Sequence, residues 1–188
     1  GYTVPGVQKK LSLHLSKEEK ARLTLVGYPS GYILKPQTNE YRALPEAEQM
    51  IMCMADAAGI TTVPHGLIQS DGTYAYITKR VDRMVLPDQS IRLLAMEDFC
   101  QLTYRLTNDK YQSSYERCAK VIDRWSSQKG LDMAEFFIRI VFSFLVGNSD
   151  MHLKNFSLLE TAPGSQEFML SPAYDMLPVN IVSTDTEE

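Results

Sequence analysis

A strongly apolar run at residues 136–145 is followed directly by a polar loop at residues 147–157. A helix from about residue 133 to residue 146 would be apolar on nearly every side, so we expect it to be buried. Six of the eight residues from 148 to 155 are polar or charged. A rigid helix fixes where the side chains of the next loop point, and such loops commonly hold catalytic groups. The sequence therefore predicts a functional loop at the end of a core helix.

The spacing within this loop is typical of phosphoryl transfer. Asp150 and Asn155 are five residues apart, as are the aspartate and asparagine of a protein-kinase catalytic loop. Either residue alone is an ordinary turn or cap former. His152 is equally compatible with a catalytic imidazole and with a histidine that holds the loop in shape. The combination of Asn148, Asp150, His152, Lys154 and Asn155 favours a phosphotransferase loop.

The first 80 residues are predicted to be rich in strands. Three short strand patterns come first and are compatible with an antiparallel meander; they cover residues 10–16, 22–26 and 31–35. An amphipathic helix is expected to begin near Pro45 and to end at Gly59. Two further strands, at residues 63–69 and 73–80, flank an Asp71-Gly72 pair that favours a type I′ hairpin turn.

The second half is predicted to be mainly helical. Residues 96–106 are predicted to form a helix, and Ser113 with Glu116 indicates a capping box at the start of the next one. The buried stripe expected on that second helix is Cys118, Val121, Ile122 and Trp125. A hairpin of residues 156–160 and 167–171 then leads to Asp175. We expect an α+β, two-lobed fold with an N-lobe at 1–82 and a C-lobe at 83–188 around a cleft.

Phosphoryl transfer requires a cation for the phosphates and oxygen ligands for magnesium. Lys35 ends a strand just before Pro36, and Glu48 lies on the following helix where it could pair with Lys35. Taken singly, Lys35 is an ordinary solvated lysine, Glu48 a first-turn residue favoured by the helix dipole, and Asp175 a turn residue. The order of strand lysine and helix glutamate is what favours a functional site.

Composition excludes few classes of function. A net charge of -4 gives no overall electrostatic reason for nucleic-acid binding. The three cysteines are widely separated and have no C-x-x-C spacing, so neither a disulfide framework nor a zinc site is predicted. No apolar run reaches transmembrane length and no signal peptide is evident, so we expect a soluble, cytoplasmic protein without a membrane partner.

The loop at 147–157, together with residues 171–177, closely resembles the HipA family of bacterial serine/threonine kinases, the toxins of HipA/HipB-type toxin–antitoxin systems. The resemblance covers most of the chain. Its other matching segments are residues 5–13, 33–36, 57–60, 78–83 and 97–101. The cluster at 148–155 is the specific part, and the remaining segments would be weak separately.

The resemblance implies a protein-kinase-like fold that uses ATP and Mg²⁺. It implies that Asp150 is the catalytic base, with His152 and Lys154 as further catalytic residues. It also implies that Asn155 and Asp175 bind magnesium. Contacts with ATP are implied for Lys35 with its partner Glu48, for Gly6 and Gln8 in the candidate phosphate loop, for the hinge residues Lys79, Arg80 and Val81, and for Asp82 near the ribose. No G-x-G-x-x-G is present, and a single Gly6 is a weak signal for a phosphate loop.

The resemblance also implies partners. Family members phosphorylate protein serine, with aminoacyl-tRNA synthetases such as the glutamyl enzyme among their targets. They are restrained by a HipB-like helix-turn-helix antitoxin, through which DNA would be contacted only indirectly. Thr3 stands where HipA carries an autophosphorylated serine, so self-phosphorylation there is an expectation. Longer members extend beyond both ends of this match, so we expect a fragment truncated at both ends, whose apolar helix would be exposed and prone to self-association.

Two other functions remain open from the residues. The first is an inactive kinase-fold module that binds an antitoxin or another protein. The second is a metal-dependent phosphohydrolase with Asp150, His152 and Asp175 as ligands, a hypothesis that gives Lys35 no role.

Overall fold

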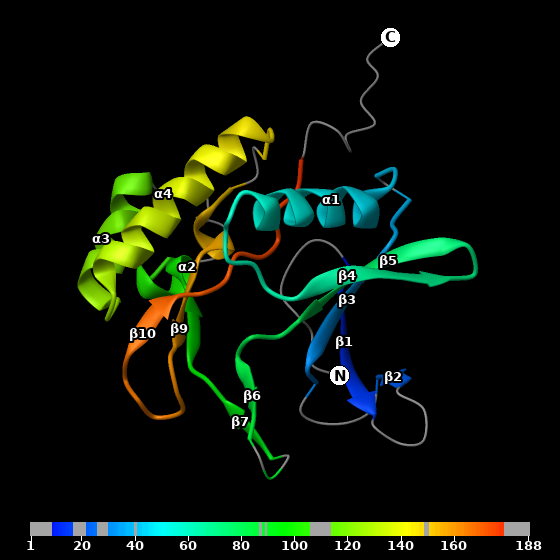
Figure 1. Ribbon diagram of the computed structural model, residues 1–188, viewed down its shortest axis with the longest axis horizontal. Helices are drawn as coiled ribbons and strands as arrows, with labels where there is room; N and C mark the ends of the chain where they lie inside the picture. The colour runs from blue at the N-terminus through cyan, green and yellow to red at the C-terminus, as the bar shows by residue number, and fades with distance from the viewer. Residues whose placement is uncertain are drawn as a thin grey trace.

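The computed structural model describes residues 9–16, 22–25, 30–39, 41–86, 88, 90–105, 114–148 and 151–178. Two groups of elements are visible in Figure 1. The first, here called the sheet lobe, consists of β1 (Leu11–Ser16), β2 (Arg22–Thr24), β3 (Tyr32–Pro36), α1 (Leu44–Ala57), β4 (His65–Ser70) and β5 (Thr73–Lys79). The second, the helical lobe, consists of β8 (Met96–Asp98), α2 (Phe99–Leu102), α3 (Tyr115–Trp125), α4 (Lys129–Leu145), a 3-10 helix (Leu153–Asn155), β9 (Ser157–Glu160) and β10 (Phe168–Leu170). A small ribbon of β6 (Arg83–Val85) and β7 (Ile91–Leu93) lies between them in the chain.

The sheet lobe contains an antiparallel sheet with the strand order β2-β1-β3-β5-β4. The predicted meander is wrong, because β1 lies between β2 and β3. β3 pairs with residues 11–13 of β1, and β2 pairs with residues 14–16. β1 is the longest of the three strands, and each half of it has its own partner.

The hairpin of β4 and β5 is confirmed. Asp71 and Gly72 both have positive φ angles, of 50° and 77°. Positive φ at both central residues is the geometry of the type I′ turn, which matches the twist of the two strands. The turn closes the register between Ser70 and Thr73.

Helix α1 is also confirmed and lies over β4 and β5 (Figure 1). Pro45 occupies its first turn, and Gly59 follows it with a φ of 81° that a residue with a side chain rarely adopts. Its buried face includes Ile51, Met52 and Ala55. These residues pack with Tyr76 of β5, which is 1% exposed.

The helix predicted at residues 96–106 is largely wrong. Met96–Asp98 forms strand β8, which pairs with β9, and α2 covers only Phe99–Leu102. The side chain of Asp98 accepts a hydrogen bond from the backbone N–H of Gln101 at 2.9 Å. Asp98 is therefore the N-cap of α2, so the helix begins only after it.

Helix α3 begins one residue later than its predicted capping box. Its N-cap is Ser114, which accepts a hydrogen bond from the backbone N–H of Arg117; Ser113 lies outside the described residues. The predicted stripe is buried at Cys118, Val121 and Ile122. Trp125 is 47% exposed, which corrects its assignment to the core.

Helix α4 is buried on one side only. Phe136 and Phe142 are in the core, whereas Phe137, Phe144 and Leu145 are 66%, 85% and 74% exposed. The expectation of burial on every side is therefore wrong, because α3 and β10 pack on one side of the helix. The expected exposure of apolar surface on this helix is present. None of the helices in the described ranges is long and apolar enough to cross a membrane.

Three clusters of buried residues are found in the described part of the chain, and the two larger ones form most of the core. The first fills the helical lobe and includes Phe99, Ile122, Phe136 and Phe156. The second is shared between the lobes, and its members are Ile51, Met52, Ala55, Ile60, Val63, Tyr76, Phe142, Ala173 and Met176. It brings α1, the end of α4 and the segment after β10 into contact. The predicted boundary near residue 82 stays a prediction.

Candidate functional site

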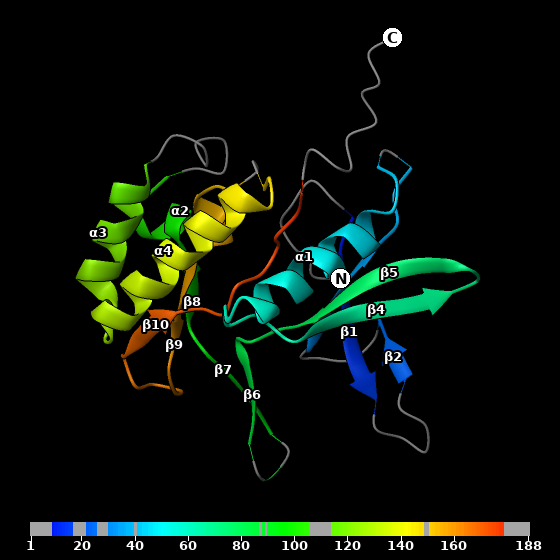
Figure 2. The ribbon, with the colours of Figure 1, turned by 45° about the horizontal axis from the view of Figure 1, so that its top comes forward.

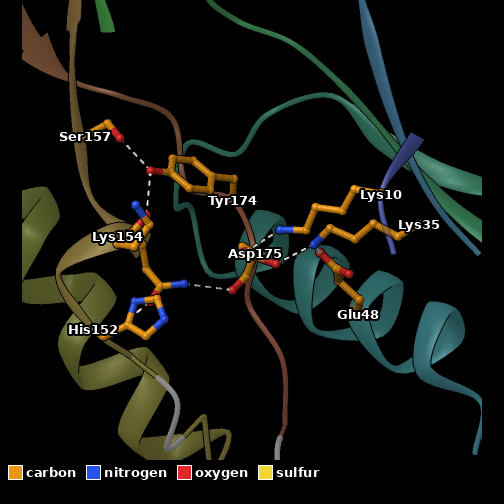
Figure 3. Close-up of polar contacts among 9 residues, drawn as sticks. Lys10, Lys35, Glu48, His152, Lys154, Ser157, Tyr174 and Asp175 are labelled. Atoms are coloured by element: carbon orange, nitrogen blue, oxygen red, sulfur yellow. Dashed lines mark hydrogen bonds and ion pairs between the residues drawn. The ribbon is translucent and has the colours of Figure 1, made fainter. Parts of the chain in front are cut away.

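Two lysines and two carboxylates meet beside α1 (Figure 3). The Nζ of Lys35 donates a hydrogen bond to Oε1 of Glu48 at 2.5 Å and another to Oδ1 of Asp175. The Nζ of Lys10 donates to Oδ2 of Asp175 at 3.4 Å. The structure thus contains the predicted pair of Lys35 and Glu48 and holds Asp175 between two ammonium groups.

Strand register and helix periodicity place Lys35 and Glu48. Lys35 lies opposite Tyr76 in the pairing of β3 with β5, and its Nζ is 5.4 Å from the centre of the Tyr76 ring. Glu48 precedes Ile51 and Met52 by three and four residues, so all three lie on the buried face of α1. The ion pair consequently forms in the layer between the sheet and the helix.

Backbone pairing places Asp175. The N–H of Ala173 donates to the carbonyl oxygen of Thr61 at 2.8 Å, and the N–H of Val63 donates to the oxygen of Ala173 at 3.0 Å. This segment leaves β10 and passes from the helical lobe to the end of α1 (Figure 2). Asp175 itself has a φ of 58°, in the left-handed region that aspartate tolerates better than most residues.

Burial and the neighbouring opposite charges shift the pKa values of these groups in opposite directions. Burial raises the pKa of Glu48 to about 7, although Lys35 lowers it. Burial alone would raise the pKa of Asp175, but Lys35 and Lys10 hold it below its ordinary range. Burial alone would lower the pKa of Lys35, but Asp175 and Glu48 raise it. Lys35 and Asp175 therefore carry full charges near neutral pH, and Glu48 titrates there.

The described part of the polar loop is tied to Asp175. The Oδ1 of Asn155 accepts a hydrogen bond from the backbone N–H of His152 at 2.9 Å, and its Nδ2 donates to the backbone oxygen of Asp175 at 3.3 Å. Asn148 is buried at the end of α4, where its N–H donates to the oxygen of Ser143 at 2.9 Å. The structure thus brings the side chain of Asn155 to the backbone of Asp175, and the binding of magnesium by these two residues stays a prediction.

Lys154 points to a different partner. Its Nζ donates to Oδ2 of Asp98 at 2.8 Å, and its carbonyl oxygen accepts a hydrogen bond from Tyr174 at 3.0 Å. The Tyr174 hydroxyl also lies 2.5 Å from Oγ of Ser157 (Figure 3). These hydrogen bonds join the loop to Asp98 and Tyr174, so the contacts of Lys154 hold the loop in place.

The predicted hinge lies at the end of β5 and has partners within the protein. The N–H groups of Lys79 and Arg80 donate to the oxygens of Pro64 and Gly31 at 2.9 and 2.8 Å. The Asp82 carboxylate accepts hydrogen bonds from Arg80 at 2.7 and 3.0 Å and from Arg83 at 2.8 Å. A base that docks beside Val81 would use backbone groups other than these two N–H groups.

Four predicted residues lie outside the described residues: Thr3, Gly6, Gln8 and Asp150. Sequence reasoning missed Lys10 as a member of the site. Its signal was its position at the basic end of the candidate phosphate loop.

The donor set beside Asn155 and Asp175 fits magnesium, which prefers carboxylate and amide oxygens and keeps several water or phosphate ligands. Oδ1 of Asn155 has a second lone pair beyond its bond to His152, and the Asp175 side chain is 32% exposed. No three His, Cys, Asp or Glu side chains in the described part of the chain form a group that could hold a metal ion. A magnesium ion here would therefore take its remaining ligands from water and from phosphate oxygens.

Comparison with known proteins identifies relatives over nearly the whole chain. The HipA-like C-terminal domain family matches residues 2–187. Two relatives from Sinorhizobium fredii, named "Putative kinase Y4mE" and "Putative kinase Y4dM", are 30% and 32% identical over 93% and 94% of this chain. A relative from Haemophilus influenzae named "Putative kinase" is 30% identical over 96%. The chain spans only 42%, 44% and 53% of the lengths of these relatives.

Solved structures share the fold. HipA of the Shewanella oneidensis toxin–antitoxin system, solved in complex with HipB and operator DNA, has a TM-score of 0.78 at 22% identity, over 95% of this chain and 44% of that one. The proinflammatory kinase CtkA of Helicobacter pylori has a TM-score of 0.60 at 19% identity, over 87% of this chain and 55% of that one. The α+β, protein-kinase-like fold predicted from the sequence is confirmed.

Proposed function

Because this chain belongs to the HipA-like C-terminal domain family, we propose that it is the ATP- and magnesium-dependent catalytic region of a serine/threonine protein kinase. The observation that carries the proposal is the contact of Lys35 with both Glu48 and Asp175. A strand lysine, a helix glutamate and a late aspartate are the groups with which protein kinases hold the phosphates and the metal. The names of three relatives as kinases agree with this proposal.

Lys35 and Lys10 would receive the phosphates of ATP. In the structure both ammonium groups face the carboxylate of Asp175, and a phosphate oxygen is an equivalent anionic acceptor for them. Glu48 keeps Lys35 extended toward the site during this exchange. The backbone around Gly6 and Gln8 is proposed to cover the phosphates. The backbone of Lys79, Arg80 and Val81 is proposed to meet the adenine, with Asp82 near the ribose.

Asp175 and Asn155 would hold magnesium, which when bound neutralises charge that develops on the transferred phosphoryl group. The hydrogen bond from Nδ2 of Asn155 to the backbone oxygen of Asp175 holds the two residues beside each other. The exposed third of the Asp175 side chain gives the carboxylate access to a ligand. Release of Asp175 from the lysines and its transfer to a cation would thus accompany nucleotide binding.

Asp150 is proposed as the base, five residues before Asn155 in the polar loop. It would accept a hydrogen bond from the substrate hydroxyl and take its proton as the oxygen attacks the phosphorus. His152 is proposed to shape the loop, since its backbone N–H donates to Oδ1 of Asn155, and catalysis by its imidazole is the second role proposed for it. Lys154 holds the loop through Asp98 and contributes to its rigidity.

We further propose the partners of this kinase. The solved HipA of Shewanella oneidensis is bound to HipB and operator DNA, which supports a HipB-like helix-turn-helix antitoxin as the partner of this protein. The net charge of -4 is consistent with contact to DNA only through that antitoxin. The protein substrate is proposed to be an aminoacyl-tRNA synthetase, and Thr3 is proposed as an autophosphorylation site.

Calorimetric titration with ATP, with and without Mg²⁺, tests the nucleotide site. We expect Lys35→Met to weaken binding of Mg-ATP by about tenfold or more, because a charge-assisted contact to phosphate is lost. Lys120→Met, which removes an exposed lysine on α3, is the matched control and should bind normally. Equal binding by both variants would contradict the proposal.

A kinase-fold module without catalysis is the second candidate, and the exposed apolar side of α4 is the observation that favours it. That function predicts tight binding of the antitoxin and no magnesium-dependent binding of ATP. A phosphohydrolase with Asp150, His152 and Asp175 as metal ligands predicts phosphate release without ATP. It leaves the ion pair of Lys35 with Glu48 without a role.

A further inference from the structure

A buried arginine on α4 contacts the backbone that leads to Asp175. Arg139 is 2% exposed, although it lies in the most apolar part of the sequence. Its Nη1 donates a hydrogen bond to the carbonyl oxygen of Ser171 at 2.8 Å. Its Nε and Nη2 donate to Oε1 of Glu135, one helical turn earlier, at 3.0 and 2.9 Å. The side chain thus connects α4 to the first residue after β10.

Glu135 extends this connection to the sheet lobe. The same Oε1 accepts a hydrogen bond from the backbone N–H of Thr61, in the loop after α1, at 3.2 Å. The oxygen of Thr61 in turn accepts from the N–H of Ala173 at 2.8 Å. Helix α4 therefore contacts the backbone of Ser171 through Arg139 and the backbone of Thr61 through Glu135. Thr61 in turn is bonded to Ala173, two residues before Asp175.

Stability alone does not account for an ion in this position. Burial lowers the pKa of Arg139, and the Glu135 carboxylate opposes this shift, so the charge is retained at a desolvation cost. Replacement of a buried ion pair by apolar residues of similar volume is often neutral or stabilising. What an apolar residue cannot supply is directional hydrogen bonds to Ser171 and Thr61. The arrangement therefore favours a role in geometry.

We propose that Arg139 and Glu135 are positioning residues for Asp175, an inference that rests on the proposed function of Asp175 as a magnesium ligand. They fix Ser171 and Thr61, which sets the position of Ala173 and hence of the carboxylate beside Lys35 and Lys10. Metal sites depend strongly on such outer-shell partners, because small displacements of a ligand weaken coordination. The consequence is a site whose magnesium dependence is controlled from α4.

The variants Arg139→Lys and Glu135→Gln test this inference. Arg139→Lys removes donors of the fork, and Glu135→Gln replaces the carboxylate with a neutral amide whose oxygen is a weaker acceptor for Arg139 and Thr61. Each variant keeps a polar side chain of similar length. We expect the Mg²⁺ concentration that gives half of the maximal ATP binding to rise by roughly tenfold, at the lower end of outer-shell effects. ATP binding in excess EDTA should stay within about twofold of wild type, because Lys35 and Lys10 are untouched.

The matched control is Thr103→Ala. The hydroxyl of Thr103 donates to the backbone oxygen of Phe99 at 2.6 Å, so the change removes a partly buried hydrogen bond at the end of α2. It should lower thermal stability while the magnesium dependence stays at the wild-type value. Hydrogen exchange of the peptide that contains Ala173 is the second readout. Exchange there should accelerate in Arg139→Lys and Glu135→Gln but not in Thr103→Ala.

The outcomes separate this inference from the proposed function. Wild-type magnesium dependence in both folded variants, or unchanged exchange at Ala173, would overturn the positioning role. An equal loss of ATP binding with and without Mg²⁺ would also overturn it, because general damage to the fold predicts that result. If the wild-type protein binds ATP without any magnesium dependence, the proposed function fails. The exchange measurement then still decides whether Arg139 and Glu135 hold the segment.

Discussion

The Nδ2 of Asn155 donates a hydrogen bond to the backbone oxygen of Asp175 at 3.3 Å, across 20 residues of sequence. This bond joins the polar loop after α4 to the segment that carries the carboxylate facing Lys35. The two residues proposed to bind magnesium thus fix each other's position. Loss of either residue should therefore first change the dependence of ATP binding on the Mg²⁺ concentration.

Asp175→Asn should remove most of the magnesium dependence of ATP binding. The variant keeps the shape of the side chain but loses the anionic oxygens that a hard cation prefers. We expect at least about a tenfold weaker response to Mg²⁺, measured by titration of the metal at constant ATP. ATP binding in EDTA should persist or strengthen, because Lys35 and Lys10 lose a competing carboxylate. A variant with the magnesium response of wild type would contradict the metal role of Asp175.

Asp150→Asn should act on turnover and leave nucleotide binding intact. Removal of a general base lowers the rate of the chemical step by roughly 10²- to 10⁴-fold. Steady-state transfer of labelled phosphate from ATP should therefore show a lower kcat with a KM for ATP near the wild-type value. Ser149→Ala, a change at the adjacent loop residue, is the control. Unchanged turnover in Asp150→Asn would remove Asp150 from the role of base.

The free energy of unfolding should depend on pH because of Glu48. Its folded pKa of about 7 lies above its ordinary value of 4.5, so the folded state binds more protons between these values. The contribution of Glu48 to the free energy of unfolding is therefore present below about pH 4.5 and falls as the pH rises to about 7. Its size is about 1.4 kcal/mol for each unit of pKa difference.

Urea unfolding of wild type and Glu48→Gln over this range measures that contribution. The free energy of unfolding of wild type, minus that of the variant, should decrease with rising pH and level off above about pH 7. Glu97→Gln, at an exposed position of β8, is the matched control for the loss of one carboxyl group. A difference that rises with pH would contradict the raised pKa.

The exposed side of α4 should promote self-association. Phe137 and Phe144 are 66% and 85% exposed on this helix. Phe137→Ser with Phe144→Ser should lower the concentration-dependent rise in light-scattering mass, because apolar contact area between copies is lost. Tyr104→Ser, at a 98% exposed aromatic outside the α4 surface, should leave the association unchanged. Equal association by all three proteins would exclude α4 as the contact surface.

Elements with local signals could be predicted from the sequence. The Asp71-Gly72 turn, the apolar periodicity of α1 between Pro45 and Gly59, and the hairpin of β9 and β10 each depend on residues close in the chain. The Lys35 to Glu48 pair was also predictable. β3 and the helix that follows it are close in the chain, so the pair could be predicted from the face of α1 on which Glu48 lies.

The remainder depended on contacts between distant residues. Met96–Asp98 has no strand signal of its own and is extended because it pairs with β9, about 60 residues later in the chain. Trp125 continues the apolar stripe of α3 but lies at the last turn, beyond the cover of the neighbouring elements. Arg139 stands within an apolar stretch of the sequence, and its burial is explained only by its hydrogen bonds to Ser171 and Glu135 in the folded chain.

The hydrophobic cluster shared by the lobes limits how this protein can be switched. Phe142 of α4 and Ala173 pack in the same cluster as Ile51 and Met52 of α1. In protein kinases, activity requires the ion pair of the strand lysine with the helix glutamate, and a shift of that helix away from the sheet breaks this pair. Here such a shift of α1 would expose apolar surface of α1, of the end of α4 and of the segment after β10, and the loss of this burial opposes the shift. Inhibitors of this protein should therefore compete for the lysines or hold the polar loop, with α1 remaining in place.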